Sequence, residues 1–257
     1  MKQEIGLDFD LHWHEHAATN ISLTKQVEAH AFLQPLFKQM KATIKPMRIL
    51  DVGCGNGVHA VGLSKEGLNS HYYCGLDLSF NAVRSARKRL HLIGSGNVAF
   101  HVGDATVLPY QSCSFDVVFS YGVIACTGKP DAVLDEMVRV CGPGGLIGIW
   151  VYPKVKGLFG AMFKITRTVC RLLGKRLSRI IAYMIVPLLP ILPVRSGVNL
   201  FNATWKQCVE VVEVNILPEV LEFYTFEEVT EWFCKRQIEI VYIDKERPNT
   251  VWGRVRK

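Results

Sequence analysis

The sequence predicts an α/β fold, in which a mostly parallel sheet has helices on both faces. From residue 46 onward, short apolar runs alternate with helical patterns, the order expected of strand–helix–strand units. The chain has 257 residues, 49% hydrophobic and 21% charged, which is enough to bury a large core. The run ILDVGCGNG, from Ile49 to Gly57, adds a glycine-rich turn after the first apolar run. Together these features indicate a nucleotide-binding α/β protein.

The predicted elements follow in chain order. A helix is expected over Lys25–Lys45, ended by Pro46. The predicted strands are Arg48–Val52, Tyr72–Leu76, Val98–Val102, Phe115–Ser120, Leu146–Val151, Ile238–Asp244 and Thr250–Val255. The predicted helices are Gly57–Glu66, Phe80–Leu92, Pro130–Val140 and Phe226–Lys235. The last two strands are expected to pair as a hairpin at the edge of the sheet.

Local signals mark several of these boundaries. Ser79 is a candidate N-cap for the helix that follows it. Thr225 and Glu228 have the spacing of a capping box. Gly142–Gly145, with the sequence GPGG, predicts a turn between the end of a helix and the next strand.

Composition excludes several classes of protein. The eight cysteines include no C-x-x-C pair, which disfavours zinc and thioredoxin sites and indicates reduced thiols in an intracellular protein. The first twenty residues are polar, unlike a signal peptide. No apolar stretch reaches the about 20 residues that a spanning helix needs. A cytoplasmic protein is therefore expected, with peripheral contact at a membrane surface as a further option.

Three glycines follow Asp51 at alternate positions, namely Gly53, Gly55 and Gly57. Glycine takes positive φ and lets a ligand approach the backbone closely. The run therefore predicts a nucleotide site between a strand and the N-terminus of a helix. A dinucleotide site would have G-x-G-x-x-G, but the third glycine position is Val58. This difference disfavours a nicotinamide cofactor.

Two further carboxylates end the next two predicted strands. Asp77, twenty or more residues after the loop, suits a pair of ribose hydroxyls, and Asp104 suits the exocyclic amine of adenine. With Asp51, they lie at the carboxyl ends of strands, where open α/β sheets bind ligands. Each alone could be an ordinary cap or turn residue. The three in order, behind a glycine loop, favour a cofactor site.

The ordered segments ILDVGCGNG, GLDLS, VGDATVLPY, SFDVVFS and CGPGGLIGI resemble the class I S-adenosylmethionine-dependent methyltransferases, in particular the methyltransferase-11 and UbiE-like group. The resemblance covers residues 46 to 151. It implies a Rossmann-like, seven-stranded sheet whose last strand is antiparallel, and S-adenosylmethionine as cofactor. The cofactor-binding residues that it implies are Asp51, Gly53, Cys54, Gly55, Gly57, Asp77, Leu78, Asp104, Ala105 and Ser120.

The resemblance also implies a role for each part of this set. Asp51, the loop glycines and Ser120 lie near the methionine part, Asp77 holds the ribose, and Leu78, Asp104 and Ala105 lie by the adenine. Cys54 is a small residue of a tight loop, since no neighbour that would activate its thiol can be placed. Ala125 and Cys126 stand where relatives often carry two histidines. That departure argues against a catalytic role for this loop. The candidate catalytic residues are His14 and Tyr121.

The N-terminal run HWHEH, from His12 to His16, has two interpretations. Histidines at this spacing can share one face and bind a metal, but the sequence fixes no further ligand, so no metal is expected. In relatives, such an aromatic segment folds over the cofactor as a lid, which would bring Trp13 and a histidine to the site.

Residues 152–207 interrupt the alternation of strands and helices. Between Met137 and Val209 there is no Asp or Glu, although the chain carries a net charge of +7. An amphipathic helix is predicted, with Arg167, Arg171, Lys175 and Arg179 on one face and Leu158, Met162, Ile165, Val169, Leu172 and Leu173 on the other. It leads into Ile180–Val194, which is uncharged and holds three prolines.

Three interpretations of this insertion stay open. It is a helical subdomain packed on the sheet or on a second subunit, a cap over a hydrophobic substrate, or an interfacial segment that contacts anionic headgroups through residues 158–194. Nucleic acid is disfavoured, because residues 180–194 are too apolar for a groove that follows phosphates.

These observations predict four regions. They are an N-terminal lid and helix (1–45), a cofactor-binding core (46–151), the helical insertion (152–207) and the end of the fold (208–257). The predicted function is methyl transfer from S-adenosylmethionine, by direct displacement, to a small or lipid-like acceptor. The alternative is a catalytically inactive cofactor-binding or membrane-associated protein of the same fold.

Overall fold

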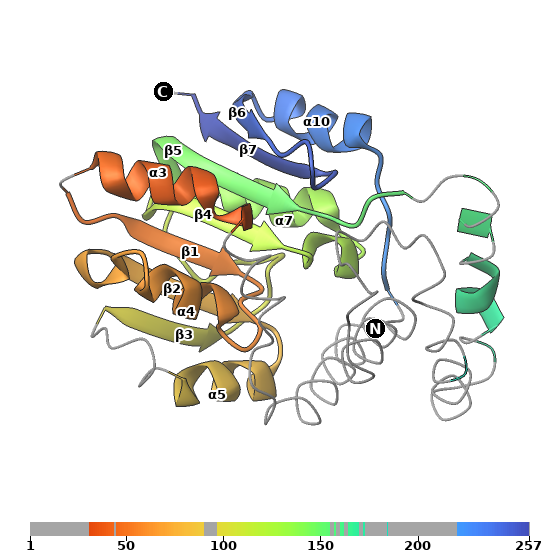
Figure 1. The fold of residues 1–257 in the computed structure, drawn as a ribbon, viewed down its shortest axis with the longest axis horizontal. Helices are drawn as coiled ribbons and strands as arrows, with labels where there is room; N and C mark the ends of the chain where they lie inside the picture. Colours follow the sequence, from red (N-terminus) through yellow and green to blue (C-terminus); the bar gives the residue numbers. More distant parts are fainter. Residues whose placement is uncertain are drawn as a thin grey trace.

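The computed structural model describes residues 31–43, 45–89, 97–154 and 220–256, together with 157, 160, 161, 164–169, 172 and 184. A seven-stranded sheet forms its centre, in the order β3-β2-β1-β4-β5-β7-β6 (Figure 1). The pairs from β3 to β5 are parallel, whereas β7 is antiparallel to both β5 and β6. The predicted α/β fold is therefore confirmed, including the antiparallel last strand and the hairpin with β6 at the edge.

The element boundaries agree closely with the sequence pattern. The strands are β1 (Arg48–Val52), β2 (Tyr72–Asp77), β3 (Val98–Val102), β4 (Phe115–Tyr121), β5 (Cys141–Trp150), β6 (Ile238–Ile243) and β7 (Thr250–Val255). The helices are α3 (Gln34–Ala42), α4 (Val58–Ser64), α5 (Phe80–Lys88), α7 (Pro130–Val140) and α10 (Phe226–Lys235), with 3-10 turns η1 (Leu68–Ser70) and η2 (Ile124–Cys126). The predicted capping box of Thr225 and Glu228 is present at the start of α10.

The largest correction concerns Gly142–Gly145. The predicted turn is wrong, because β5 starts at Cys141, directly after α7. Cys141 pairs with Phe115, and the register then shifts before Val117 pairs with Leu146. The extra residues are accommodated as a β-bulge, in which glycine is favoured.

Three helices are shorter than predicted. Within the described residues, α3 ends at Ala42 and not at Lys45, because Thr43 is already extended. α4 ends at Ser64 and not at Glu66, because the Lys65 N–H donates to Leu63 O and not to the carbonyl of the residue four positions earlier. α5 ends at Lys88 and not at Leu92, because the Arg89 N–H bonds to Ala86 O. Such tightened last turns are common where helices end. Residues 25–30 of the first predicted helix lie outside the described residues.

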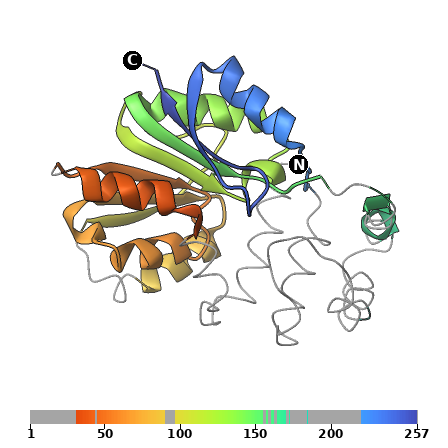
Figure 2. The same ribbon diagram turned by 45° about the horizontal axis from the view of Figure 1, so that its top comes forward.

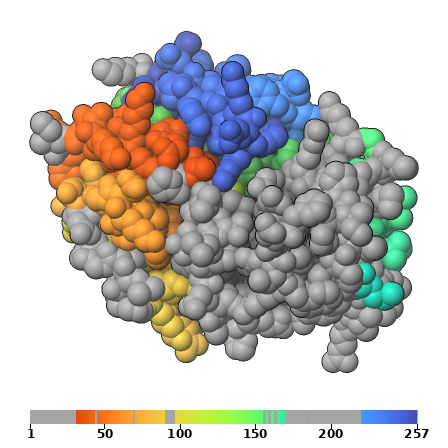
Figure 3. Space-filling model, in the orientation of Figure 1, coloured from red at the N-terminus to blue at the C-terminus, as the bar shows by residue number. Residues whose placement is uncertain are grey.

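Helices cover both faces of the sheet, with α3, α4 and α5 on one face and α7 and α10 on the other (Figure 2). Successive residues of β1 point to opposite faces. Ile49 lies in the core under α3 to α5, and Leu50 and Val52 lie in the core under α7 and α10. The ends of the described chain also meet, since Trp252 Nε1 donates to Phe32 O at 3.1 Å, and Figure 3 shows α3 beside the C-terminal strands.

The chain reverses the direction in which it adds strands at β1. The chain adds β2 and β3 on one side of this strand and then returns to add β4 and β5 on its other side (Figure 1). Open α/β sheets bind ligands beyond the carboxyl ends of strands at such a reversal. The described residues include no helix long and apolar enough to cross a membrane.

Candidate functional site

The glycine loop between β1 and α4 has the backbone that the sequence predicts. Gly53, Gly55 and Gly57 have φ of 82°, 52° and 81°, a region that side chains with a Cβ rarely adopt. A Cβ on Gly53 would lie 2.1 Å from Cγ2 of Val123. The Gly53 N–H donates to Leu76 O at 2.7 Å, which holds the loop against the end of β2. Both φ and space therefore require glycine at position 53.

Asp77 joins the loop to the next helix. Its Oδ2 accepts the Gly55 N–H at 2.8 Å and its Oδ1 accepts the Ser79 N–H at 2.9 Å. Ser79 is the N-cap of α5, as predicted, and its Oγ accepts the Ala82 N–H at 3.0 Å. Each carboxylate oxygen can accept a further hydrogen bond, which is what a ribose diol would need.

The third strand-end carboxylate shapes the loop after β3. Asp104 Oδ1 accepts hydrogen bonds from the Thr106 N–H at 2.8 Å and the Thr106 hydroxyl at 2.7 Å. Ala105 beside it is buried, whereas Leu78 after β2 is 40% exposed. Asp51, Asp77 and Asp104 therefore all lie at one edge of the sheet, around the glycine loop.

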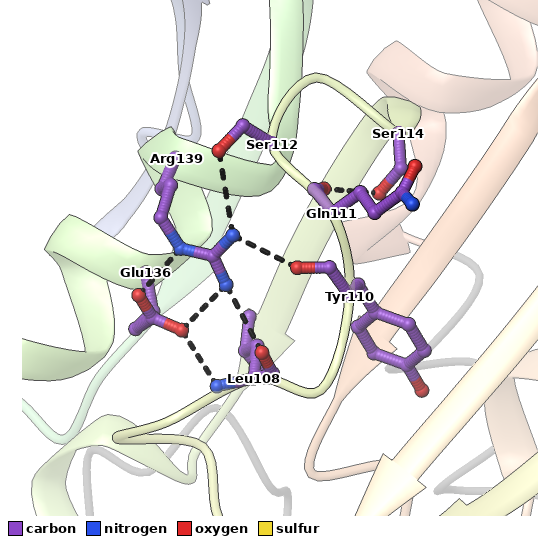
Figure 4. A network of polar contacts seen from close by, with 7 residues as sticks. All are labelled: Leu108, Tyr110, Gln111, Ser112, Ser114, Glu136 and Arg139. Carbon is purple, nitrogen blue, oxygen red and sulfur yellow. Dashed lines mark hydrogen bonds and ion pairs between the residues drawn. The ribbon is translucent and has the colours of Figure 1, made fainter.

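Two side chains of helix α7 form hydrogen bonds with the backbone of the loop that follows Asp104 (Figure 4). The Arg139 guanidinium donates to Leu108 O at 3.0 Å and to Tyr110 O at 2.8 Å. It also forms two hydrogen bonds with Glu136, whose Oε2 accepts the Leu108 N–H at 2.6 Å. The hydrogen bonds from Arg139 hold the pKa of Glu136 below its usual value. These contacts of Arg139 and Glu136 were not predicted from the sequence.

Asp51 has two partners, Tyr73 and His59, that were not predicted from the sequence. Asp51 is fully buried, and its Oδ2 accepts the Tyr73 hydroxyl at 2.6 Å and lies 3.0 Å from His59 Nδ1. Asp51 pairs with Gly75 across β1 and β2, so Tyr73 lies two positions away on the same face. His59 stands alone in a helical pattern and has no distinctive spacing, so no sequence signal reveals this network.

Two other predicted residues are buried inside the fold. Cys54 is 2% exposed, and burial, followed by the charges of Asp77 and Asp51, raises the pKa of its thiol well above the usual value. It is therefore protonated at neutral pH and is not a nucleophile. Ser120 is fully buried, and its hydroxyl donates to Val52 O at 2.9 Å. This hydrogen bond links β4 to β1.

Aromatic side chains follow β4 and β5 at the same edge of the sheet. Tyr121 stacks on Trp150 with ring centroids 4.5 Å apart, and Trp150 contacts Tyr152 at 4.8 Å. Cys126, in the buried turn η2, has its pKa raised to about 12 by burial. Tyr121 therefore lies at the carboxyl end of β4, and its catalytic role stays a prediction. His14 lies outside the described residues.

In the described part of the insertion, a residue of the basic face is buried and residues of the apolar face are exposed. Arg167 is 6% exposed, and its guanidinium carbon lies 6.0 Å from the ring centroid of Phe223. Ile165 and Leu172, on the predicted apolar face, are 63% and 82% exposed. An arginine can be buried in this way because its stem is apolar and its guanidinium packs on an aromatic ring. The remaining predicted positions of this helix lie outside the described residues, except Val169, which is 40% exposed.

Comparison with known proteins gives the family. The profile of a family described as a methyltransferase domain matches residues 44–184. A probable phthiotriol/phenolphthiotriol dimycocerosates methyltransferase 2 of Mycobacterium ulcerans is 35% identical over 105 residues, 41% of this chain and 39% of that protein. The fatty-acid O-methyltransferase of Mycolicibacterium smegmatis is 30% identical over 135 residues, 52% of this chain and 48% of that protein. Each match thus spans less than half of the relative's length.

Solved structures share the fold at low sequence identity. A SAM-dependent methyltransferase from Aquifex aeolicus superposes with a TM-score of 0.53 and 15% identity, over 92% of this chain and 100% of that one. The putative methyltransferase in complex with the Haloferax volcanii Trm112 activator gives a TM-score of 0.59 and 15% identity, over 98% of both chains. With the profile match to more than half of the sequence, these findings show that the chain belongs to the methyltransferase domain family, among the class I S-adenosylmethionine-dependent methyltransferases.

Proposed function

We propose that this chain transfers a methyl group from S-adenosylmethionine to a small lipophilic acceptor. The observation that carries the proposal is the placement of Asp51, Asp77 and Asp104 around the glycine loop, at the edge of the sheet where its strand order reverses. The relatives named for phthiotriol and fatty-acid methylation support a lipophilic acceptor.

The residues of the edge fit this cofactor. The backbone of Gly53 leaves no room for a Cβ, and Gly55 is tied to Asp77, which is suited to the ribose hydroxyls. Asp104 and Ala105 are suited to the adenine, with Leu78 beside it. These assignments extend the family's pattern to this chain position by position.

When bound, S-adenosylmethionine supplies a methyl group that is already electrophilic. The protein then has to hold the acceptor in line with that methyl group and exclude water. We assign this task to the aromatic row of Tyr121, Trp150 and Tyr152, which lies at the ends of β4 and β5. An oxygen or nitrogen acceptor that must lose a proton would need a base, for which Tyr121 and His14 are the candidates.

The division into regions gives each part a role in the proposal. Residues 1–45 would supply a lid, residues 46–151 and 208–257 the methyltransferase fold, and residues 152–207 a cap over the acceptor. Because Ile165 and Leu172 are exposed while Arg167 is buried, we propose that the cap contacts a membrane surface through apolar side chains. The protein would then be cytoplasmic and peripheral to the membrane.

Transfer of a labelled methyl group tests the proposal. The protein is incubated with S-adenosylmethionine carrying a radioactive methyl group and with separate lipid and polar extracts. Label is expected in a lipid product, and Asp77→Ala should abolish it. Label confined to the polar extract would contradict a lipophilic acceptor. Binding of the cofactor with no transfer to either extract would instead favour an inactive cofactor-binding protein.

Sedimentation with vesicles tests the membrane contact. Binding to vesicles should persist at high salt, because apolar contacts are not screened, and Leu172→Asp should weaken it. Binding that requires anionic lipid and disappears at high salt would contradict an apolar contact. Glu239, which is exposed on β6, offers a control substitution to Gln on the other side of the fold.

A further inference from the structure

Asp51 has only one of its two carboxylate oxygens satisfied within the described part of the chain. Its Oδ2 contacts both Tyr73 and His59. Its Oδ1 is buried and accepts no hydrogen bond from any described residue. A buried carboxylate oxygen without a donor costs free energy. This oxygen, two residues before the glycine loop, therefore marks a place for a donor that a ligand would bring.

Tyr73 donates firmly to Asp51. Burial, followed by the charge of Asp51, raises the pKa of the Tyr73 hydroxyl well above its usual value. The hydroxyl therefore stays protonated and donates to the carboxylate at 2.6 Å. A hydrogen bond with an ionised acceptor is stronger than one between neutral groups.

His59 holds the same oxygen from the other side. In the tautomer that carries its hydrogen on Nδ1, His59 donates to this oxygen across the 3.0 Å contact. The ring is 4% exposed and packs edge-on against Phe119, with centroids 5.4 Å apart, and against Tyr121 at 5.5 Å. With the ring fixed by these contacts, the carboxylate cannot turn freely.

We propose that His59 and Tyr73 are positioning residues, which hold the carboxylate of Asp51 with its Oδ1 toward the ammonium group of the methionine part, where the family resemblance places this aspartate. The proposal rests on the proposed function, since the methionine part of S-adenosylmethionine carries such an ammonium group. A carboxylate held in place before binding loses little freedom when the ligand arrives. The positive charge of the ligand also strengthens the hydrogen bond.

Two ligands separate this role from a purely structural one. S-adenosylhomocysteine carries the ammonium group, whereas 5′-methylthioadenosine has the same nucleoside and a thioether but no ammonium group. His59→Leu removes the donor at Nδ1, His59→Asn keeps an N–H near that position, and Tyr73→Phe removes only a hydroxyl. Affinities are measured by calorimetry, with circular dichroism as the check on folding.

His59→Leu and Tyr73→Phe should each lower the affinity for S-adenosylhomocysteine about 10-fold, which corresponds to the loss of roughly one hydrogen bond to a charged group. Neither variant should change the affinity for 5′-methylthioadenosine. His59→Asn should recover most of the lost affinity for S-adenosylhomocysteine. If His59→Leu fails to fold, Tyr73→Phe, which is nearly isosteric, carries the same test.

The positioning role would be overturned if the folded variants lost the same amount of affinity for both ligands. It would also be overturned if their affinity for both ligands were unchanged. If the variants give either result while the wild-type protein binds both ligands, the proposed function still stands. A folded wild-type protein that binds neither ligand contradicts the proposed function and this inference together.

Discussion

Among single residues, Asp77 has a double role, because its carboxylate holds the glycine loop and faces the place proposed for the ribose. Asp77→Ala removes the acceptor of the Gly55 and Ser79 N–H groups. We expect a loss of at least about 1.5–3 kcal/mol in cofactor binding, the value of one hydrogen bond to a charged group. Calorimetric titration with S-adenosylhomocysteine measures this loss. Asp116→Ala, at the opposite end of β4, is the matched control and should not change the affinity.

Gly53 and Gly62 form a second residue-level test. Gly53→Ala combines a φ of +82° with a Cβ only 2.1 Å from Val123. The free energy of unfolding should therefore fall by about 1–3 kcal/mol or more. Gly62, inside α4, has nothing within 4 Å of its added Cβ. Gly62→Ala should therefore stabilise the protein by roughly 0.5–1 kcal/mol. Thermal unfolding measures both changes, and a stabilising Gly53→Ala would contradict the observed loop.

Residue types predicted part of the site, but not its buried network. Glycines at alternate positions and strand-end aspartates carry information locally, so Gly53 and Asp77 could be found from the sequence. His59 could not, because one histidine in a helical pattern has no distinctive spacing. Its role depends on the β1–β2 register, which brings Tyr73 and Asp51 to the same face.

At the level of elements, Glu136 and Arg139 join α7 to the loop after β3. Because the pKa of Glu136 is lowered in the fold, its ionised form stabilises the native state above the pKa that it has when unfolded. This stability is lost as pH falls through the lowered pKa of the folded state. Thermal unfolding of wild type and Glu136→Gln should therefore differ at neutral pH and converge in acid. A difference that is independent of pH would contradict the ion pair.

Elements with strong end signals were predicted best. The capping box of Thr225 and Glu228 predicted the start of α10 at Phe226, and α7 begins at Pro130 as expected. Gly142–Gly145 was misassigned because glycine and proline favour turns and β-bulges alike. Only the pairing of Cys141 with Phe115 decides between these two possibilities.

On the scale of the whole molecule, Trp252 joins the last strand to the first described helical segment. It is fully buried, and its indole N–H donates to Phe32 O. Trp252→Phe leaves that carbonyl without its donor and removes buried volume. The free energy of unfolding should fall by about 1–3 kcal/mol, measured by denaturant titration. Trp150→Phe, at a half-buried ring, is the comparison, and an equal loss in both variants would contradict a special role for Trp252.

The sheet as a whole followed from the sequence, whereas the insertion did not. Alternation of apolar runs and helices predicted the parallel strands, since each crossover needs a helix. Helical spacing divided the insertion into a basic and an apolar face but did not decide which of them is buried. In the structure Arg167, on the basic face, is buried against Phe223, a contact between segments far apart in the chain that helical spacing cannot reveal.

Equilibrium binding of S-adenosylhomocysteine and of NAD to the folded protein tests the central claim most directly. Binding of S-adenosylhomocysteine that is lost in Asp77→Ala, together with no binding of NAD, is the result expected of a methyl-donor site at the carboxyl edge of the sheet. The site would be contradicted if the folded protein did not bind S-adenosylhomocysteine. It would also be contradicted if the Asp77→Ala variant bound this ligand as well as the wild-type protein does.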